Sequence, residues 1–167
     1  MDLLSDRLKF SFSTIDNFDE HIRSSVPGYQ FLFDSSLLIS EFFIREHTKV
    51  IDIGCSTGLF LKSLSDKYID GILDGVSFVG IEKEKNLSCD FKDYIDKNNS
   101  LEFVIGNITH DYLLSKYFSN ISFCTSLFTL QFLSASEKNK VIQVVYDGLN
   151  KGGGFIVSEK VFLVFQI

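Results

Sequence analysis

The stretch Val50-Ile-Asp-Ile-Gly-Cys-Ser-Thr-Gly58 decides the fold of this chain of 167 residues. An apolar segment leads into Asp52 and then into a turn with glycines at positions 54 and 58, after which helical periodicity begins. In an open α/β sheet, a strand, turn and helix of this kind lie where a nucleotide-like ligand binds. The spacing Asp52-x-Gly54-x-x-x-Gly58 lacks the G-x-G-x-x-G of dinucleotide-binding folds, so it predicts a ligand other than NAD.

The loop resembles the first motif of class I S-adenosylmethionine-dependent methyltransferases, and the resemblance implies S-adenosylmethionine as the ligand. Small residues after Gly54 let the backbone approach the methionyl part, while the next helix offers unpaired N–H groups to its carboxylate. Asp52 is expected to meet the amine, directly or through water. The alternative is an ordinary tight turn between a strand and a helix. We interpret Cys55 as a small loop residue, because no basic residue stands near it in sequence.

Short apolar segments predict strands buried on both faces at 49–53, 77–82, 101–105, 121–126 and 154–159. Helical periodicity lies between them at 59–68, 85–97, 112–118 and 136–149, and a further helix at 31–46 is expected to cover the sheet. This alternation gives right-handed βαβ units and a parallel sheet. We expect an α/β fold: a Rossmann-like class I methyltransferase sheet in strand order 3-2-1-4-5 with helices on both faces.

The length suits one domain. We expect a single S-adenosylmethionine-binding domain over 1–167, with an N-terminal helical cover (1–47), a Rossmann-like core (48–160) and an apolar tail (161–167). The last helix and strands 6 and 7 of a methyltransferase sheet are expected to be missing, because the chain ends on the run Val161 to Ile167. An unpaired apolar edge is an aggregation hazard unless it is covered, so we expect a truncated chain or a homodimer.

Composition argues against several classes of protein. Sixteen basic and 22 acidic residues give a net charge of −6, which disfavours direct nucleic-acid binding. No signal peptide is recognisable, and no apolar run approaches the ~18 residues of a membrane span, so membrane association is not expected. Three isolated cysteines suit the cytoplasm. We expect no metal, because the histidines share no metal-ligand spacing with each other or with cysteine and carboxylate residues: His21, His47 and His110.

Polar residues at other strand ends complete the candidate site. Glu82 ends the second predicted strand, where an acid accepts hydrogen bonds from both ribose hydroxyls, although a solvated charge is the alternative. Asn107 follows the third strand and is a candidate for the adenine amino group, with Ile108 packing on the ring; Asn after Gly is also a common turn. Ser126 is either a polar group of the pocket or a strand-end hydroxyl.

Three further segments narrow the resemblance. They are Phe18-Asp-Glu-His-Ile-Arg-Ser-Ser-Val-Pro-Gly-Tyr29, Phe128-Thr-Leu-Gln-Phe-Leu133, and Gly148-Leu-Asn-Lys-Gly-Gly-Gly154 with Ser158-Glu-Lys160. With the loop, they resemble the carboxy-S-adenosylmethionine synthase family from about Phe10 to Lys160. The resemblance implies a reaction of S-adenosylmethionine with prephenate through a sulfonium ylide. The product, carboxy-S-adenosylmethionine, would serve a partner enzyme that modifies the wobble uridine of certain tRNAs.

The resemblance also assigns residues, and Tyr29 matches the family's ligand-binding tyrosine. Gly54-Cys55-Ser56 match its loop contacts and Asn107-Ile108 its adenine contacts, where the family usually has Asp at the first position. Glu82-Lys83 stand where the family has Asp-Asn, so a longer acid faces the ribose. Leu127 replaces a pocket asparagine. The family's arginine for the added carboxylate would lie beyond Ile167, and no catalytic residue is assigned.

Three hypotheses follow from the sequence. The first is an enzyme of the transferase class that binds S-adenosylmethionine or carboxy-S-adenosylmethionine and resembles carboxy-S-adenosylmethionine synthase. The second is a conventional methyltransferase acting on a small molecule, in which Leu127 reshapes the pocket for an apolar acceptor. The third is a non-catalytic, truncated domain that binds S-adenosylmethionine or another protein.

Overall fold

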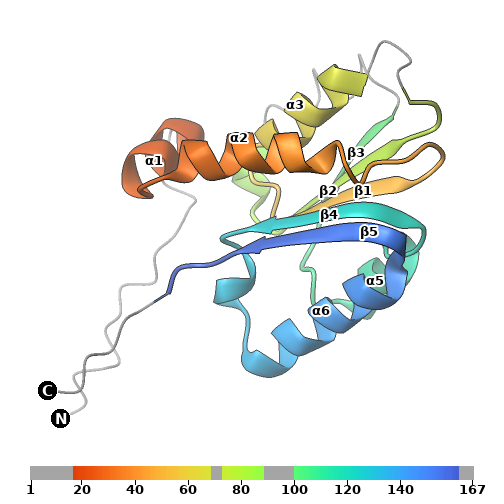
Figure 1. Ribbon diagram of the computed structural model, residues 1–167. Helices are drawn as coiled ribbons and strands as arrows, with labels where there is room; N and C mark the ends of the chain where they lie inside the picture. The colour runs from red at the N-terminus through yellow and green to blue at the C-terminus, as the bar shows by residue number, and fades with distance from the viewer. Residues whose placement is uncertain (1–16, 69–72, 89–99, 162–167) are drawn as a thin grey trace, which may run out of the picture.

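The computed structural model describes residues 17–68, 73–88 and 100–161. These residues form one parallel sheet between two layers of helices (Figure 1). The elements, in chain order, are α1 (Phe18–Ser25), α2 (Tyr29–Ser40), β1 (Lys49–Ile53), α3 (Leu59–Tyr68), β2 (Ser77–Glu82), η2 (Lys85–Ser88), β3 (Leu101–Ile105), α5 (Asp111–Tyr117), β4 (Ile121–Leu127), η3 (Leu130–Phe132), α6 (Ala135–Gly148) and β5 (Leu149–Ser158).

The sheet has the order β3-β2-β1-β4-β5, and each neighbouring pair is parallel. The chain runs outward from β1 to β3, then crosses to the other side of β1 for β4 and β5. This reversal creates a switch point between β1 and β4, outside the carboxyl ends of the strands, where α/β sheets bind ligands. The predicted strand order and fold class are confirmed.

Alternation along β1 divides the core into two layers. Val50 packs with Phe33 and Leu61 on the side of α2 and α3. Ile51 packs with Leu113 and Val141 on the side of α5 and α6. Figure 1 shows these helices on opposite faces of the sheet. Because β1 is buried on both faces, Asp52 is also buried, and it projects on the same side as Val50.

Several element boundaries differ from the sequence prediction. The helix expected at 31–46 is Tyr29–Ser40, followed by a turn. The strand expected at 154–159 starts at Leu149, which pairs with Ile121 before an irregularity in the register. Beyond it, Gly154 lies against Phe43, and an added Cβ would be 2.7 Å from that ring. The helix expected at 85–97 begins as the short η2, while 89–99 and the tail from 162 lie outside the described residues.

Helix α1 lies within the expected N-terminal helical cover (1–47), but the sequence analysis gave it no bounds of its own. Its N-cap is Asn17, whose side chain accepts a hydrogen bond from the Glu20 N–H at 3.3 Å, and acidic residues occupy its first turn. None of its residues is buried. The Thr57 hydroxyl donates a hydrogen bond of 2.7 Å to the Asp19 carboxylate, which ties α1 to the loop after β1.

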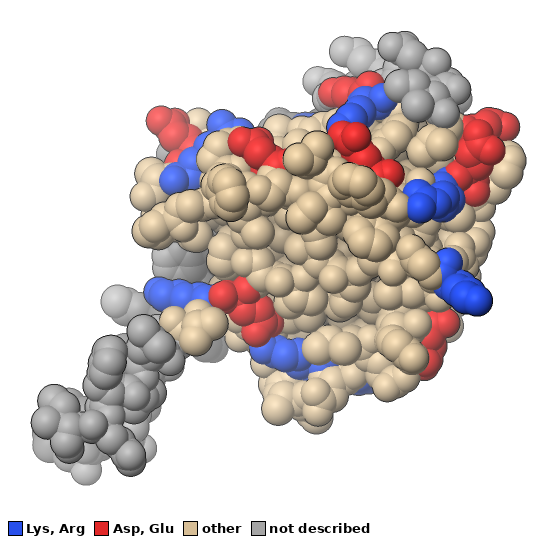
Figure 2. Space-filling view, in the orientation of Figure 1, with Lys and Arg blue, Asp and Glu red and all other residues tan. Residues whose placement is uncertain are grey.

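One face of the molecule is poor in charge. Figure 2 shows a broad uncharged area in the orientation in which α2 and β5 face the viewer in Figure 1, with charged side chains around its rim. Several apolar side chains on α2, on the turn after it and on β5 are exposed: Phe31, Leu38, Ile39, Phe42 and Val157. Among the described helices, none has the length and apolar character needed to cross a membrane.

Candidate functional site

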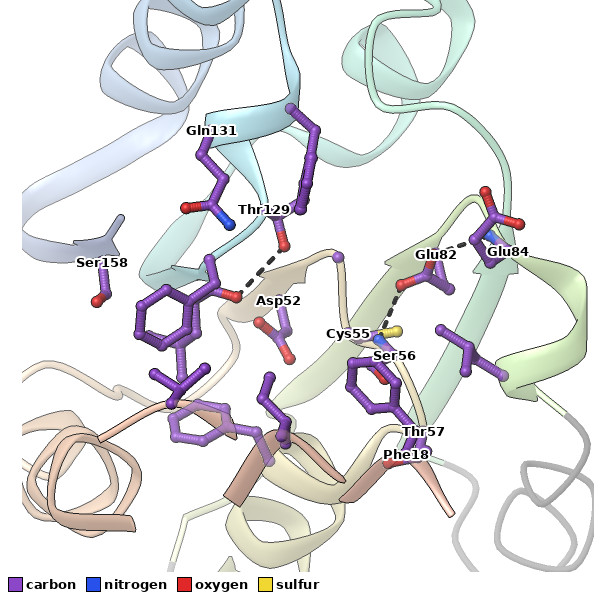
Figure 3. A pocket seen from close by; sticks show the side chains of 18 of the residues that line it. Phe18, Asp52, Cys55, Ser56, Thr57, Glu82, Glu84, Thr129, Gln131 and Ser158 are labelled. Carbon is purple, nitrogen blue, oxygen red and sulfur yellow. Dashed lines mark hydrogen bonds between the residues drawn. The ribbon is translucent and has the colours of Figure 1, made fainter. Parts of the chain in front are cut away.

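A cavity of about 1090 Å³ lies at the carboxyl ends of the strands, under α1 and the start of α2 (Figure 3). Ligand cavities commonly measure about 300–1,000 Å³, so this one compares with the larger sites that bind a small molecule. Leu127 and most of the predicted site residues line it: Tyr29, Asp52, Gly54, Cys55, Ser56, Glu82, Lys83, Asn107 and Ile108. Gly58 and Ser126, which the sequence also offered as candidates, are absent from the lining.

The loop after β1 depends on left-handed glycines. Gly54 has φ of 74°, and its N–H donates to the Ile81 carbonyl at 2.8 Å. Gly58 also has φ of 74° and closes the turn by donating to the Cys55 carbonyl at 2.8 Å. A Cβ on Gly54 would be 2.0 Å from the Thr129 hydroxyl. Gly54 therefore serves both the turn and the close approach of the segment after β4.

Glu82 joins the end of β2 to this loop. Its side chain is 8% exposed, and its Oε2 accepts a hydrogen bond from the Ser56 N–H at 2.9 Å. Oε1 accepts two more, from the N–H groups of Lys83 at 2.7 Å and Glu84 at 2.8 Å. A carboxylate offers about four acceptor directions, so one remains on Oε2. The reading of Glu82 as a freely solvated charge is wrong.

Asp52 is buried at the switch point. It is 4% exposed, and Oδ1 accepts a hydrogen bond from the Thr125 hydroxyl of β4 at 2.7 Å. Burial, and to a smaller extent the neighbouring Glu82 carboxylate, raises the pKa of Asp52 to about 7, against the effect of the Thr125 hydrogen bond. A positively charged group bound next to Asp52 would lower this pKa and favour the ionised carboxylate.

Aromatic side chains form the wall opposite the loop. The Tyr29 ring lies 6.1 Å from that of Phe128 and 6.2 Å from that of Phe33, measured between centroids. Burial, together with the nearby Asp52 and Asp19 carboxylates, raises the pKa of Tyr29 to about 12. The phenol is therefore a neutral hydrogen-bond donor at physiological pH.

Asn107 forms a turn at the end of β3. Its Oδ1 accepts a hydrogen bond from the Thr109 N–H at 3.1 Å, and its carbonyl accepts one from the His110 N–H at 3.0 Å. One acceptor direction of Oδ1 remains. Ile108 is 7% exposed and packs with the cluster between the sheet and α5. The turn expected as the alternative is present, and both residues still line the cavity.

The remaining candidate residues are Cys55, Lys83 and Ser126. Cys55 is buried, and burial raises the pKa of its thiol well above the usual value, which agrees with a packing residue. Lys83 is exposed. Ser126 is fully buried outside the cavity lining, and its hydroxyl has no hydrogen-bond partner among the described residues. In the described part of the chain, no three histidine, cysteine or acidic residues are grouped so as to hold a metal ion.

Sequence reasoning missed several groups at the cavity. Thr129 covers Gly54, while Gln131 and Ser158 line the side toward β5. The Gln131 Oε1 accepts a hydrogen bond from the Lys160 N–H at 2.9 Å. Asp19 lines the rim near Thr57. Gln131 and Ser158 stood in segments that carried the family resemblance, but the sequence contained no sign that these two segments meet.

The fold places the chain among Rossmann-like class I methyltransferase structures. A putative methyltransferase in complex with the Trm112 methyltransferase activator, from Haloferax volcanii, superposes with a TM-score of 0.62. Sequence identity is 16%, and the match covers 85% of this chain and 56% of that chain. A scan against models of protein families finds no match.

Sequence similarity is more specific than the fold. The carboxy-S-adenosyl-L-methionine synthase of Staphylococcus epidermidis is 36% identical over 151 residues, which cover 90% of this chain and 62% of that protein. The synthase of Shewanella oneidensis is 30% identical, with 86% and 57% covered. The chain is a homologue of these synthases, as the sequence resemblance implied. It spans about 60% of the length of the curated relatives that it matches.

Proposed function

We propose that this chain binds S-adenosylmethionine and supplies the ligand-binding core of a carboxy-S-adenosylmethionine synthase. The observation that carries the proposal is the Glu82 carboxylate, which is buried at the end of β2 and bonded to the Ser56 N–H of the loop. The acid proposed to bind the ribose and the loop proposed to bind the methionyl part are thereby joined at the carboxyl ends of β1 and β2. The homology with carboxy-S-adenosylmethionine synthases supports the choice of ligand.

In this proposal the ligand lies across β1, β2 and β3. Its ammonium group meets Asp52, and the backbone of Gly54, Cys55 and Ser56 approaches its methionyl part. The free acceptor direction on Glu82 Oε2 takes one ribose hydroxyl, rather than the two expected from sequence, because Oε1 already accepts two N–H bonds. The adenine lies against Ile108, with its amino group donating to Asn107 Oδ1. Gly58 shapes the loop without contacting the ligand.

The proposed chemistry converts the methyl group of S-adenosylmethionine into a carboxymethyl group. Prephenate loses carbon dioxide and hydroxide as its ring becomes aromatic, leaving phenylpyruvate. The hydroxide takes a proton from the methyl group, which the adjacent sulfonium acidifies, and becomes water. The resulting ylide carbon bonds to the carbon dioxide. The chain's contribution is to hold both molecules in one cavity and exclude bulk water, since positioning supplies most of such an acceleration.

Two measurements test this proposal. Calorimetric titration is expected to show S-adenosylmethionine binding, and its absence would refute the ligand. Incubation with S-adenosylmethionine and prephenate, followed by mass spectrometry, is expected to give a product heavier by one carbon dioxide. Binding without that product would refute synthase activity for this chain and leave the binding site intact.

A conventional methyltransferase is the second candidate, and Leu127 favours it. This side chain lines the cavity and packs with the apolar cluster around Phe123. With Tyr29 and Phe128 it makes the region beside β4 apolar, which suits a small hydrophobic acceptor. Release of S-adenosylhomocysteine in the presence of small aromatic acceptors, without carboxylated product, would favour this reading.

The cellular setting belongs to the same proposal. We infer a single-domain, cytoplasmic protein whose product serves a partner enzyme of tRNA modification. We also infer a homodimer in which the uncharged face over α2 and β5 is buried between the two copies. The buried free thiols of Cys55 and Cys124 suit a reducing compartment. Light scattering during gel filtration is expected to give twice the mass of the 19.0 kDa chain. A monomeric mass would contradict the dimer.

A further inference from the structure

Helix α1 covers one side of the cavity without belonging to the hydrophobic core. Phe18, Ile22 and Val26, the last directly after the helix, are spaced four residues apart and therefore lie on one side of it. All three line the cavity and are partly buried. Neither core cluster of the described residues includes any of them. The apolar side of α1 therefore faces the space in which the ligand is proposed to lie.

A single tight turn joins α1 to α2. It spans Val26 to Tyr29, and the Tyr29 N–H donates to the Val26 carbonyl at 3.1 Å. Pro27 occupies the second position and Gly28 the third, with φ of 77°, as a type II turn requires. An added Cβ on Gly28 would meet nothing within 4 Å, so the turn has free space beside it. Helix α2 itself is anchored by the buried Phe33, so rotation at the turn can move α1 while α2 stays on the sheet.

The hydrogen bonds of several α1 side chains stay within the helix. The Asn17 amide donates to the Glu20 carboxylate at 2.9 Å, and the Ser24 hydroxyl donates to the His21 carbonyl at 2.9 Å. Ser25 Oγ lies 3.4 Å from His21 Nε2. Such bonds stabilise the helix itself and remain intact when it moves as a unit.

One side-chain hydrogen bond joins the first turn of α1 to the loop after β1. The Thr57 hydroxyl donates to the Asp19 carboxylate at 2.7 Å, and both residues line the cavity. Figure 3 shows Thr57 at the same edge of the cavity as Phe18. The loop end of this bond is fixed, because the neighbouring Ser56 N–H is bonded to Glu82. The bond therefore connects a fixed loop to a helix that lies outside the core.

We propose that α1 is a lid that opens at Gly28 to admit and release S-adenosylmethionine, and that the hydrogen bond from Thr57 to Asp19 is the latch that holds it closed. The inference rests on the proposed function, which supplies the ligand. Closure of the lid over the bound sulfonium keeps bulk water away from the reacting methyl group, as closing segments do in many enzymes.

A latch of this kind has a distinct effect on binding kinetics. The bond is present in the closed protein with and without ligand, so its loss weakens both closed states equally and increases the open fraction of each. The rate constants for association and dissociation then rise by the same factor, and Kd, which is their ratio, stays the same. A fixed helix that only contacts the ligand would behave differently, with faster dissociation, unchanged association and weaker binding.

Thr57→Val and Asp19→Ala remove the latch from its two sides. Surface plasmon resonance with S-adenosylmethionine over immobilised protein is expected to show both rate constants about fivefold higher in each variant, the effect of one net hydrogen bond, with Kd within about twofold of wild type. A buffer of about 0.5 M salt screens the charge lost from Asp19. The double variant is expected to match the single variants, because both changes remove the same bond.

Two matched controls make the same changes away from the latch. Thr109→Val and Asp147→Ala lie outside α1 and the loop after β1, and both should bind with the rate constants of wild type. Urea unfolding of every variant identifies any that has lost its fold.

Each other outcome has a definite meaning. Wild-type protein that fails to bind S-adenosylmethionine refutes the proposed function, and with it a lid for this ligand. Binding with rate constants unchanged in both variants overturns the lid and leaves the function standing. Faster dissociation with weaker Kd shows a fixed wall and also overturns it. A change in only one of the two single variants shows that their shared hydrogen bond is not the latch.

Discussion

The Glu82 carboxylate accepts a hydrogen bond of 2.9 Å from the Ser56 N–H, so the end of β2 is bonded to the loop that follows β1. With the N–H groups of Lys83 and Glu84, three backbone donors converge on one buried side chain. Such convergence holds the carboxylate in one position before any ligand arrives. The ligand then meets a preorganised acceptor and does not have to order a mobile one.

Glu82→Gln is expected to damage both the fold and the site. An amide has one acceptor atom, so its NH₂ group must face one of the backbone N–H donors. We expect a loss of about 1–3 kcal/mol in the free energy of unfolding, measured in urea, and loss of S-adenosylmethionine binding. Glu84→Gln is a matched control, because only its backbone N–H takes part, and it should behave as wild type. An unchanged affinity in Glu82→Gln would contradict the assigned role.

Asp52→Asn is expected to change how stability depends on pH. The folded-state pKa of about 7 lies above the usual 3.8, so the folded state holds the proton more tightly than the unfolded state. Wild-type stability therefore falls as pH rises through this interval and levels off above about 7. The variant keeps an acceptor for Thr125 but has no proton to lose. Between pH 5 and 8, we expect wild type to lose up to about 3 kcal/mol more than the variant. Parallel unfolding curves at both pH values would show that Asp52 does not titrate in this range.

Ligand binding is expected to release a proton through the same carboxyl group. At pH 6 the Asp52 carboxyl is mostly protonated, and an ammonium group bound beside it favours the ionised form. Calorimetry of S-adenosylmethionine binding in buffers of different ionisation enthalpy should show release of up to one proton at pH 6 and much less at pH 8. The Asp52→Asn variant provides the baseline. A proton count independent of pH would place the ammonium group elsewhere.

Gly54→Ala is expected to disrupt the loop through the protein's own packing. The sequence analysis connected small residues in this loop with the approach of the ligand, but an added Cβ on Gly54 meets the Thr129 side chain first. Gly152→Ala measures the cost of a left-handed backbone alone, because Gly152 has φ of 82° and an added Cβ there would meet open space. We expect a loss of about 1–2 kcal/mol for Gly152→Ala and clearly more for Gly54→Ala, with partial rescue by Thr129→Ala. Equal losses for the two glycines would show that Thr129 moves aside freely.

Thr57→Val is expected to loosen α1. The substitution removes the 2.7 Å hydrogen bond from the Thr57 hydroxyl to Asp19 and keeps the size of the side chain. No residue of α1 is fully buried, so this hydrogen bond adds to the contacts with α2 that hold the helix over the cavity. Limited trypsin digestion should cut after Arg23 several times faster in the variant, with little change in global stability. Thr109→Val, outside this contact, is the control, and equal cleavage rates would show that other contacts hold α1.

Strands β1 and β2 were predictable because each is buried on both faces and therefore appears in the sequence as a short apolar run. Strand β3, at the edge of the sheet, is only partly buried. The predicted bounds of 49–53, 77–82 and 101–105 match the observed strands. Helix α1 was given no bounds of its own because its pattern is weakly apolar and its stability comes from contacts with α2 and the loop. The start of β5 at Leu149 was not predicted, because the glycines that follow it usually mark a turn.

The sequence alone determined the fold class and the glycine-containing loop after β1, because buried strands, left-handed glycines and an acid at a strand end are local requirements. The tertiary structure alone decided which distant side chains meet. Three hydrogen-bonded pairs show this. Glu82 bonds to Ser56 across 26 residues of sequence, Asp52 to Thr125 across 73, and Gln131 to Lys160 across 29. Burial raises the pKa of Asp52. The hydrogen bond from the Lys160 N–H fixes which way the Gln131 amide is oriented. Both effects depend on neighbours that only the folded sheet brings together.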